Sequence, residues 1–138
     1  MNAPTKTLDL GLFLIRLMLG VVFVYHGGQK LFGIWGGYGI EGTAGFFEQI
    51  GIPFPTVSVV MAGGAEFFGG LALIAGVASR IAGLLLAVTM LVAAFSAHGG
   101  AFGAQNDGME YPLTLAVCAA ALALTGSGAL ALRPSVQN

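Results

Sequence analysis

Charged residues are scarce in this chain of 138 residues, of which 8% are charged and 57% are hydrophobic. A soluble domain usually carries about 25% charged residues. Five Lys and Arg together with six Asp and Glu are too few to cover a surface that faces water. We therefore expect lipid to be the solvent for most of the surface. The net charge of -1 also lacks the basic excess that nucleic-acid binding needs, so no nucleic-acid partner is expected.

Cysteine is almost absent. The single Cys118 excludes an intramolecular disulfide, a Cys-x-x-Cys redox pair and a zinc site built from thiolates. Any redox function of this chain therefore does not pass through a dithiol cycle of its own. The sequence also carries no flavin, nicotinamide or iron–sulfur motif, so electrons would have to come from a partner or from a bound quinone.

Four long apolar segments predict the fold. Each is close to the ~20 residues that cross a hydrocarbon core about 30 Å thick. We predict one all-α domain over residues 1–138, an integral membrane bundle of four transmembrane helices with boundaries near 8–32, 57–77, 81–97 and 113–132. A short helix over 43–50 is expected to lie in the headgroup layer, with a lid over the bundle as the alternative.

A weak internal repeat divides the chain into two halves. Phe23-x-x-His26-Gly-Gly near the end of the first segment matches Phe95-x-x-His98-Gly-Gly near the end of the third. The pattern is compatible with two repeated helical hairpins, an arrangement known in transporters. Glycines inside the segments, such as Gly63, favour close packing of helix backbones in lipid.

The few cations predict the orientation of the bundle. Lys6, Arg80 and Arg133 lie on one side of a four-span bundle, whereas the two longer loops on the other side are mostly acidic. By the positive-inside rule, both termini face the cytoplasm. Four short helices enclose little space, so association into a homo-oligomer remains an alternative to a monomer.

Two charged residues lie deep in the predicted membrane. Arg16 and Glu66 would each cost roughly 2.5–3.5 kcal/mol near a bilayer centre. Arg16 precedes His26 by about 15 Å of helix, and Glu66 lies about 14 Å below the start of its own helix at Val57. The matching depths predict a buried ion pair between Arg16 and Glu66. Two roles stay open for this pair: a purely structural contact that fixes the register of the helices, or a substrate or proton site.

A second polar group is expected at the outer end of the bundle. Histidine suits proton transfer to a quinone headgroup because it titrates near neutral pH. Two histidines with loop carboxylates lack the spacing of a helical zinc site, so no metal ligand is assigned, and a haem held by two histidines is a weaker alternative. Histidines that only cap helix carbonyls are the remaining interpretation. The candidate residues for a ligand or proton site are His26, Lys30, His98 and Glu110.

In order and spacing, these residues resemble the DoxX family of small bacterial membrane proteins. The resemblance implies a component of a redox system in the bacterial inner membrane, such as a subunit of a quinone oxidoreductase or a partner in thiol homeostasis. The C-terminal Leu130-Ala-Leu-Arg departs from the serine, leucine and aspartate that are usual in the family. The motifs are Arg16-Leu-Met-Leu-Gly, His26-Gly-Gly-Gln-Lys30-Leu-Phe-Gly, Phe47-Glu-x-x-Gly-Ile-Pro, Gly64-Ala-Glu66-x-x-Gly-Gly and Glu110-Tyr-Pro.

Three functions stay open at this point. The first is a membrane subunit or partner of a quinone- or thiol-linked redox system, acting as an oxidoreductase only together with a partner. The second is a small transporter or channel, which charges at the membrane midplane and the repeat would suit. The third is a non-catalytic scaffold that holds a soluble partner at the membrane.

Overall fold

The computed structural model describes residues 3–134, and every regular element in this range is helical. The predicted all-α membrane bundle is confirmed. Three helices are long and apolar enough to cross a membrane, over Thr5–Phe32, Pro55–Ala75 and Ser79–Ser96. In chain order the elements are α1 (Ala3–Phe32), α2 (Gly39–Gln49), α3 (Pro55–Ala75), α4 (Ser79–Ser96), the short 3-10 helix η1 (Ala104–Asn106) and α5 (Glu110–Thr125).

Large apolar side chains cover the outside of the bundle. Met18 on α1 is 63% exposed and Ile81 on α4 is 65% exposed, and many other leucines, valines and phenylalanines are similarly open. In water, apolar surface on this scale would drive association. Against acyl chains it carries no such cost, because lipid tails are as apolar as these side chains.

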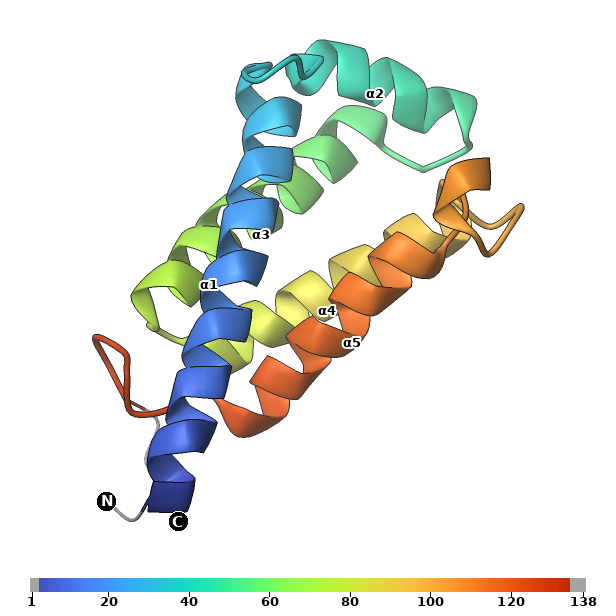
Figure 1. Ribbon diagram of the computed structural model, residues 1–138. Helices are drawn as coiled ribbons and strands as arrows, with labels where there is room; N and C mark the ends of the chain where they lie inside the picture. The colour runs from blue at the N-terminus through green and yellow to red at the C-terminus, as the bar shows by residue number, and fades with distance from the viewer. Residues whose placement is uncertain (1–2, 135–138) are drawn as a thin grey trace.

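The long helices form two pairs. α1 packs along α3, and α4 packs along α5, which is the pairing expected of two helical hairpins (Figure 1). Gly76 ends α3 in the left-handed conformation with φ 70°, and this lets the chain turn tightly into α4. From this turn the two pairs spread apart toward the end of the bundle where α2 lies (Figure 1).

Glycines set the distance between the helices within each pair. A Cβ atom placed on Gly27 of α1 would lie 2.4 Å from the backbone nitrogen of Phe67 on α3. A Cβ on Gly83 of α4 would lie 2.6 Å from the carbonyl oxygen of Ala119 on α5. No real side chain fits at such distances, so both contacts require glycine. Close backbone packing through small residues is what the composition predicted.

The last helix ends earlier than predicted. We expected helix over 113–132, but α5 ends at Thr125. Gly126 has φ 81° and ψ -160°, a conformation outside the helical region that favours glycine. With 16 residues α5 is about 24 Å long, shorter than the hydrocarbon core.

The residues after α5, which we call the closing segment (126–133), run back beneath α1 and α3. The backbone N–H of Ala129 donates to Asp9 Oδ1 on α1 over 2.8 Å. The Arg16 guanidinium, on a residue only 1% exposed, donates to the carbonyls of Leu73 and Leu130. Two buried charged side chains of α1 therefore hold the closing segment against the end of α3.

Candidate functional site

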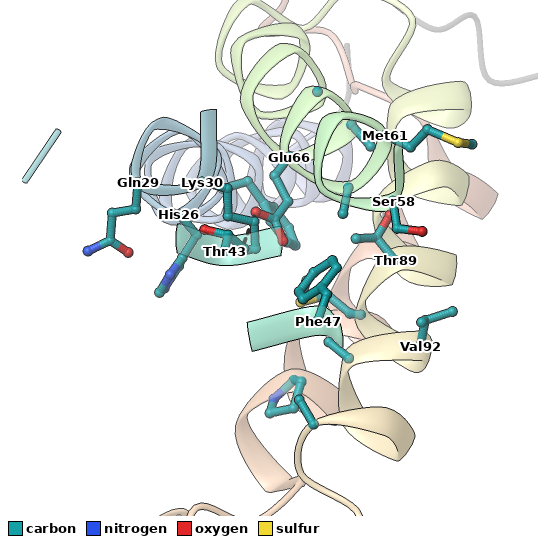
Figure 2. A pocket seen from close by; sticks show the side chains of 18 of the residues that line it. His26, Gln29, Lys30, Thr43, Phe47, Ser58, Met61, Glu66, Thr89 and Val92 are labelled. Carbon is teal, nitrogen blue, oxygen red and sulfur yellow. Dashed lines mark hydrogen bonds and ion pairs between the residues drawn. The ribbon is translucent and has the colours of Figure 1, made fainter. Parts of the chain in front are cut away.

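A cavity of about 1170 Å³ lies between the α1/α3 pair and the α4/α5 pair. It exists because α3 and α4 diverge from their tight turn, so that their other ends are too far apart for side chains to fill the space. Most of its lining is apolar. Figure 2 shows the cavity with His26 and Lys30 on one side, Thr89 and Val92 on the other, and Phe47 of α2 between them.

An ion pair lies in the wall of this cavity. Lys30 Nζ on α1 is 2.8 Å from Glu66 Oε2 on α3, and the two side chains point toward one another (Figure 2). The Glu66 side chain is 2% exposed and the Lys30 side chain 24%. Within residues 3–134 no other salt bridge is present. The Lys30 side chain is long enough to reach the carboxylate, and its Cβ lies beside Gly63 of α3.

This contact corrects the predicted ion pair between Arg16 and Glu66. The structure leaves Arg16 at the other end of α3, where its donors go to the carbonyls of Leu73 and Ile74. The depth comparison failed because it set His26 level with Val57 near the start of α3, whereas the packing of α1 on α3 brings Gly27 beside Phe67. Arg16 and Lys30 lie 14 residues, or about 21 Å, apart along α1, and this register puts Lys30 rather than Arg16 within reach of Glu66.

The ion pair retains hydrogen-bonding capacity toward the cavity. An ammonium group has three donors, and one of those on Lys30 is used by Glu66 Oε2. Within the described part of the chain, Glu66 Oε1 has no protein donor. A polar ligand atom can therefore meet either charge without breaking the pair.

His26 lies half-buried one helical turn before Lys30, and it lines the same cavity. Its ring is 6.4 Å from the ring of Tyr111 on α5, with the planes 58° apart. Edge-to-face packing on the neighbouring Tyr25, at 5.4 Å, holds the imidazole in place. His26 and Tyr111 thus bring aromatic side chains together across the gap between α1 and α5.

His98 follows α4 directly and also lines the cavity. Its Nδ1 lies 2.8 Å from the carbonyl oxygen of Asp107. A carbonyl can only accept, so Nδ1 carries the proton and Nε2 of the neutral ring remains an acceptor. The structure therefore brings three of the four candidate residues, His26, Lys30 and His98, to one cavity.

Glu110, the fourth candidate, does not line the cavity. Its Oε1 accepts the backbone N–H of Ala104 over 2.8 Å and so stabilises the loop around η1. The carboxylate lies at the start of α5, where a negative charge is also favoured by the helix dipole. Its role in the structure is local, because the loop folds back on the helix start rather than over the cavity.

Three lining residues were missed by reasoning from the sequence. Tyr111 and Gln29 are polar lining residues, and Phe47 enters from α2 above. The amphipathic pattern of 43–50 indicated a surface segment, and the observed helix α2 covers the wider mouth of the cavity with that apolar side. Tyr111 had no local signal beyond its neighbour Pro112, since only the packing of α5 brings it near His26.

Groups of three or more His, Cys, Asp or Glu side chains arranged to hold a metal ion do not occur among residues 3–134. Cys118 is a partly buried free thiol on α5. The polar groups that line the cavity are the ion pair, the two imidazoles, the Gln29 amide and the hydroxyl groups of Tyr38, Thr43, Ser58, Thr89, Ser96 and Tyr111.

Comparisons with known proteins agree on one family. The DoxX family model matches residues 11–99. A Bacillus subtilis (strain 168) protein named "Putative oxidoreductase CatD" is 37% identical over 131 residues, covering 95% of this chain and 90% of that protein. The "Inner membrane protein YqjF" of Escherichia coli (strain K12) is 30% identical over 128 residues, covering 92% of each chain. No solved structure gives a match.

Proposed function

Because this chain belongs to the DoxX family of membrane proteins, we propose that it is a membrane subunit or partner of a quinone-linked redox system and binds a quinone-type headgroup in its cavity. The observation that carries the proposal is the position of the Lys30–Glu66 pair in the wall of a large, mostly apolar cavity that also holds His26 and His98. An apolar space suits the ring, and the polar groups suit its two oxygens.

The chemistry of a quinone explains why these groups would be useful. Reduction of a quinone to a quinol takes up two electrons and two protons. His26 and His98 are the general acid–base groups that can exchange protons with the quinone oxygens. The Lys30 ammonium would stabilise negative charge that develops on an oxygen before it is protonated. The electrons come from a partner redox protein, which places this chain as a component rather than as a complete enzyme.

The names of two relatives support this proposal. CatD is named as an oxidoreductase and YqjF as a protein of the inner membrane. We propose the bacterial inner membrane as the location of this chain, with both termini in the cytoplasm as the positive-inside rule predicts. A scaffold function would need none of the polar groups in the cavity, so ligand binding separates the two functions.

Direct binding tests the proposal. A short-tailed quinone should bind saturably to the wild-type protein in nanodiscs, as followed by equilibrium dialysis. His26→Ala should weaken quinone binding by about tenfold, which corresponds to the loss of one good hydrogen bond. Because Nε2 of neutral His98 is an acceptor, His98→Ala should weaken binding of the quinol, whose hydroxyl groups donate, by about tenfold and change quinone binding by less than about twofold. Gln49→Ala is the matched control, because Gln49 is an exposed polar residue at the end of α2 outside the cavity lining. Absence of saturable binding would contradict the proposal and favour the scaffold function.

A further inference from the structure

The cavity has an apolar side between α3 and α4, opposite the ion pair. Near the tight turn the two helices touch, since a Cβ on Gly69 of α3 would lie 3.2 Å from Leu86 Cγ of α4. Residues three and four positions further along a helix lie on the same face of it. From this contact toward the diverging ends, such residues of α3 face α4 and such residues of α4 face α3. Four of them are small and line the cavity. They are Ala65 and Ala62 on α3 and Thr89 and Ala93 on α4, and we call the space between them the α3/α4 slot.

Hydroxyl groups beside the α3/α4 slot are already used within the protein. Thr89 Oγ1 donates to the carbonyl of Leu85 over 2.8 Å, and Ser58 Oγ donates to the carbonyl of Pro53 over 2.7 Å. Neither hydroxyl hydrogen is therefore left for a ligand. Met61 and Val92, which flank it on the outside, are 69% and 55% exposed (Figure 2). In a membrane these two side chains contact acyl chains, so the slot connects the cavity with lipid.

Polar groups gather on the other side of the cavity. Lys30 and His26 come from α1, and the His26 ring approaches Tyr111 across the α1/α5 gap. The carboxylate of Glu66 is almost wholly buried, yet its Oε1 has no protein donor within residues 3–134. Because Glu66 lines the cavity, a donor from a ligand can reach this oxygen. The cavity is thus polar beside α1 and apolar toward the α3/α4 slot.

We infer that the ligand is a membrane-resident amphiphile with a single apolar tail, whose headgroup lies beside the Lys30–Glu66 pair and whose tail passes through the α3/α4 slot into the bilayer. The inference deepens the proposed function and rests on it, since it assigns the quinone to the lipid-soluble, long-tailed class. A tail in the slot would pack against small apolar side chains and continue among the acyl chains of the bilayer. A water-soluble ring without a tail would leave the slot unfilled.

The test narrows the slot without touching the polar side. Thr89→Trp places a large ring in the α3/α4 slot, and Leu91→Trp adds the same ring to an exposed position of α4 outside the cavity lining. Binding of two quinones with the same headgroup, one with a long isoprenoid tail and one with a methyl group in its place, is measured in nanodiscs. We expect Thr89→Trp to weaken the long-tailed quinone by about tenfold and the short one less than about twofold, and Leu91→Trp to change neither. Equal effects of Thr89→Trp on both quinones, or no effect on either, would overturn the inference.

A second measurement separates this inference from the proposed function. If the wild-type protein binds neither quinone, the proposed function is contradicted. The α3/α4 slot is then tested through the fluorescence of an introduced tryptophan. In a Trp35→Phe background, which removes the one natural tryptophan, the introduced Trp of Thr89→Trp should be quenched by lipids brominated along their acyl chains and protected from aqueous iodide. A single-tailed fatty alcohol should displace the brominated chains and relieve this quenching, while the Trp of Leu91→Trp should keep its quenching. Quenching of Thr89→Trp by iodide would show a water-filled slot and overturn the inference.

Discussion

Lys30 on α1 and Glu66 on α3 form an ion pair, with 2.8 Å between Nζ and Oε2. A comparison of depths along the helices had predicted Arg16 as the partner of Glu66. Arg16, the other cation inside the bundle, is 1% exposed and uses backbone carbonyls instead. The two cations therefore act in separate places. One lies in the wall of the cavity, where a ligand can reach it, and the other holds the closing segment.

Breaking the ion pair from the lysine side should be the more damaging change. Lys30→Met would leave the buried Glu66 carboxylate without a partner, and we expect a loss of about 2–3 kcal/mol in the free energy of unfolding. Glu66→Gln should cost less, about 1 kcal/mol, because the Lys30 side chain is 24% exposed and its ammonium can turn toward water. The double variant should recover part of the loss in denaturant unfolding in detergent. Lys6→Met, at an exposed lysine, is the control, and a coupling energy below about 0.5 kcal/mol would show that the contact contributes little.

Arg16 should stabilise the closing segment. Arg16→Met removes the donors to the carbonyls of Leu73 and Leu130, and we expect a loss of about 1–3 kcal/mol because Leu130 loses the Arg16 donor and Leu73 keeps only the Gly76 N–H. Hydrogen exchange at the Leu132 amide, which donates to the Ala75 carbonyl, should become faster. Exposed Arg80→Met serves as the control.

Arg16→Met also tests whether Arg16 and Glu66 lie apart. Because Arg16 does not contact Glu66, the stability losses of Arg16→Met and Glu66→Gln should add within about 0.5 kcal/mol. A larger coupling between them would restore the ion pair that the depth comparison predicted and contradict the structure.

Gly27 should tolerate no side chain. Gly27→Ala puts a Cβ at 2.4 Å from the Phe67 nitrogen and must push α1 away from α3, so we expect a loss of about 1–3 kcal/mol. Gly11→Ala is the matched control on the same helix, since a Cβ there meets nothing within 4 Å. It should be neutral or stabilising by up to about 1 kcal/mol through helix propensity. Similar melting temperatures for the two variants would contradict the close packing.

The orientation of the bundle can be measured in intact cells. In a Cys118→Ala background, Gly45→Cys on α2 should react with an impermeant maleimide, because the excess of cations on the opposite side places α2 outside. Ala78→Cys, in the exposed turn between α3 and α4, should react only after the cells are opened. Ser79 is less suitable because it is 4% exposed. Labelling of Ala78→Cys alone in intact cells would reverse the orientation.

Composition and periodicity determined the class of this protein and much of its layout. Scarce charge and long apolar segments are local properties, and they predicted an all-α membrane bundle with α1, α3 and α4 close to their observed bounds. The spacing of His26 and Lys30 on one helix, and the position of His98 at the end of another, depend only on helix geometry. These three residues line the cavity at this end of the bundle.

Tertiary structure decided which polar groups meet. The partner of Glu66 depends on the register between α1 and α3, which is set by interlocking glycine contacts such as that of Gly27 with Phe67 and not by depth along either helix. The return of the closing segment depends on Asp9, which accepts the Ala129 N–H, and on Arg16, which donates to the Leu130 carbonyl, both more than a hundred residues away in sequence. Periodicity says which face of a helix is apolar, but it does not say how far one helix slides along another, and that sliding decides the contacts of each buried charge.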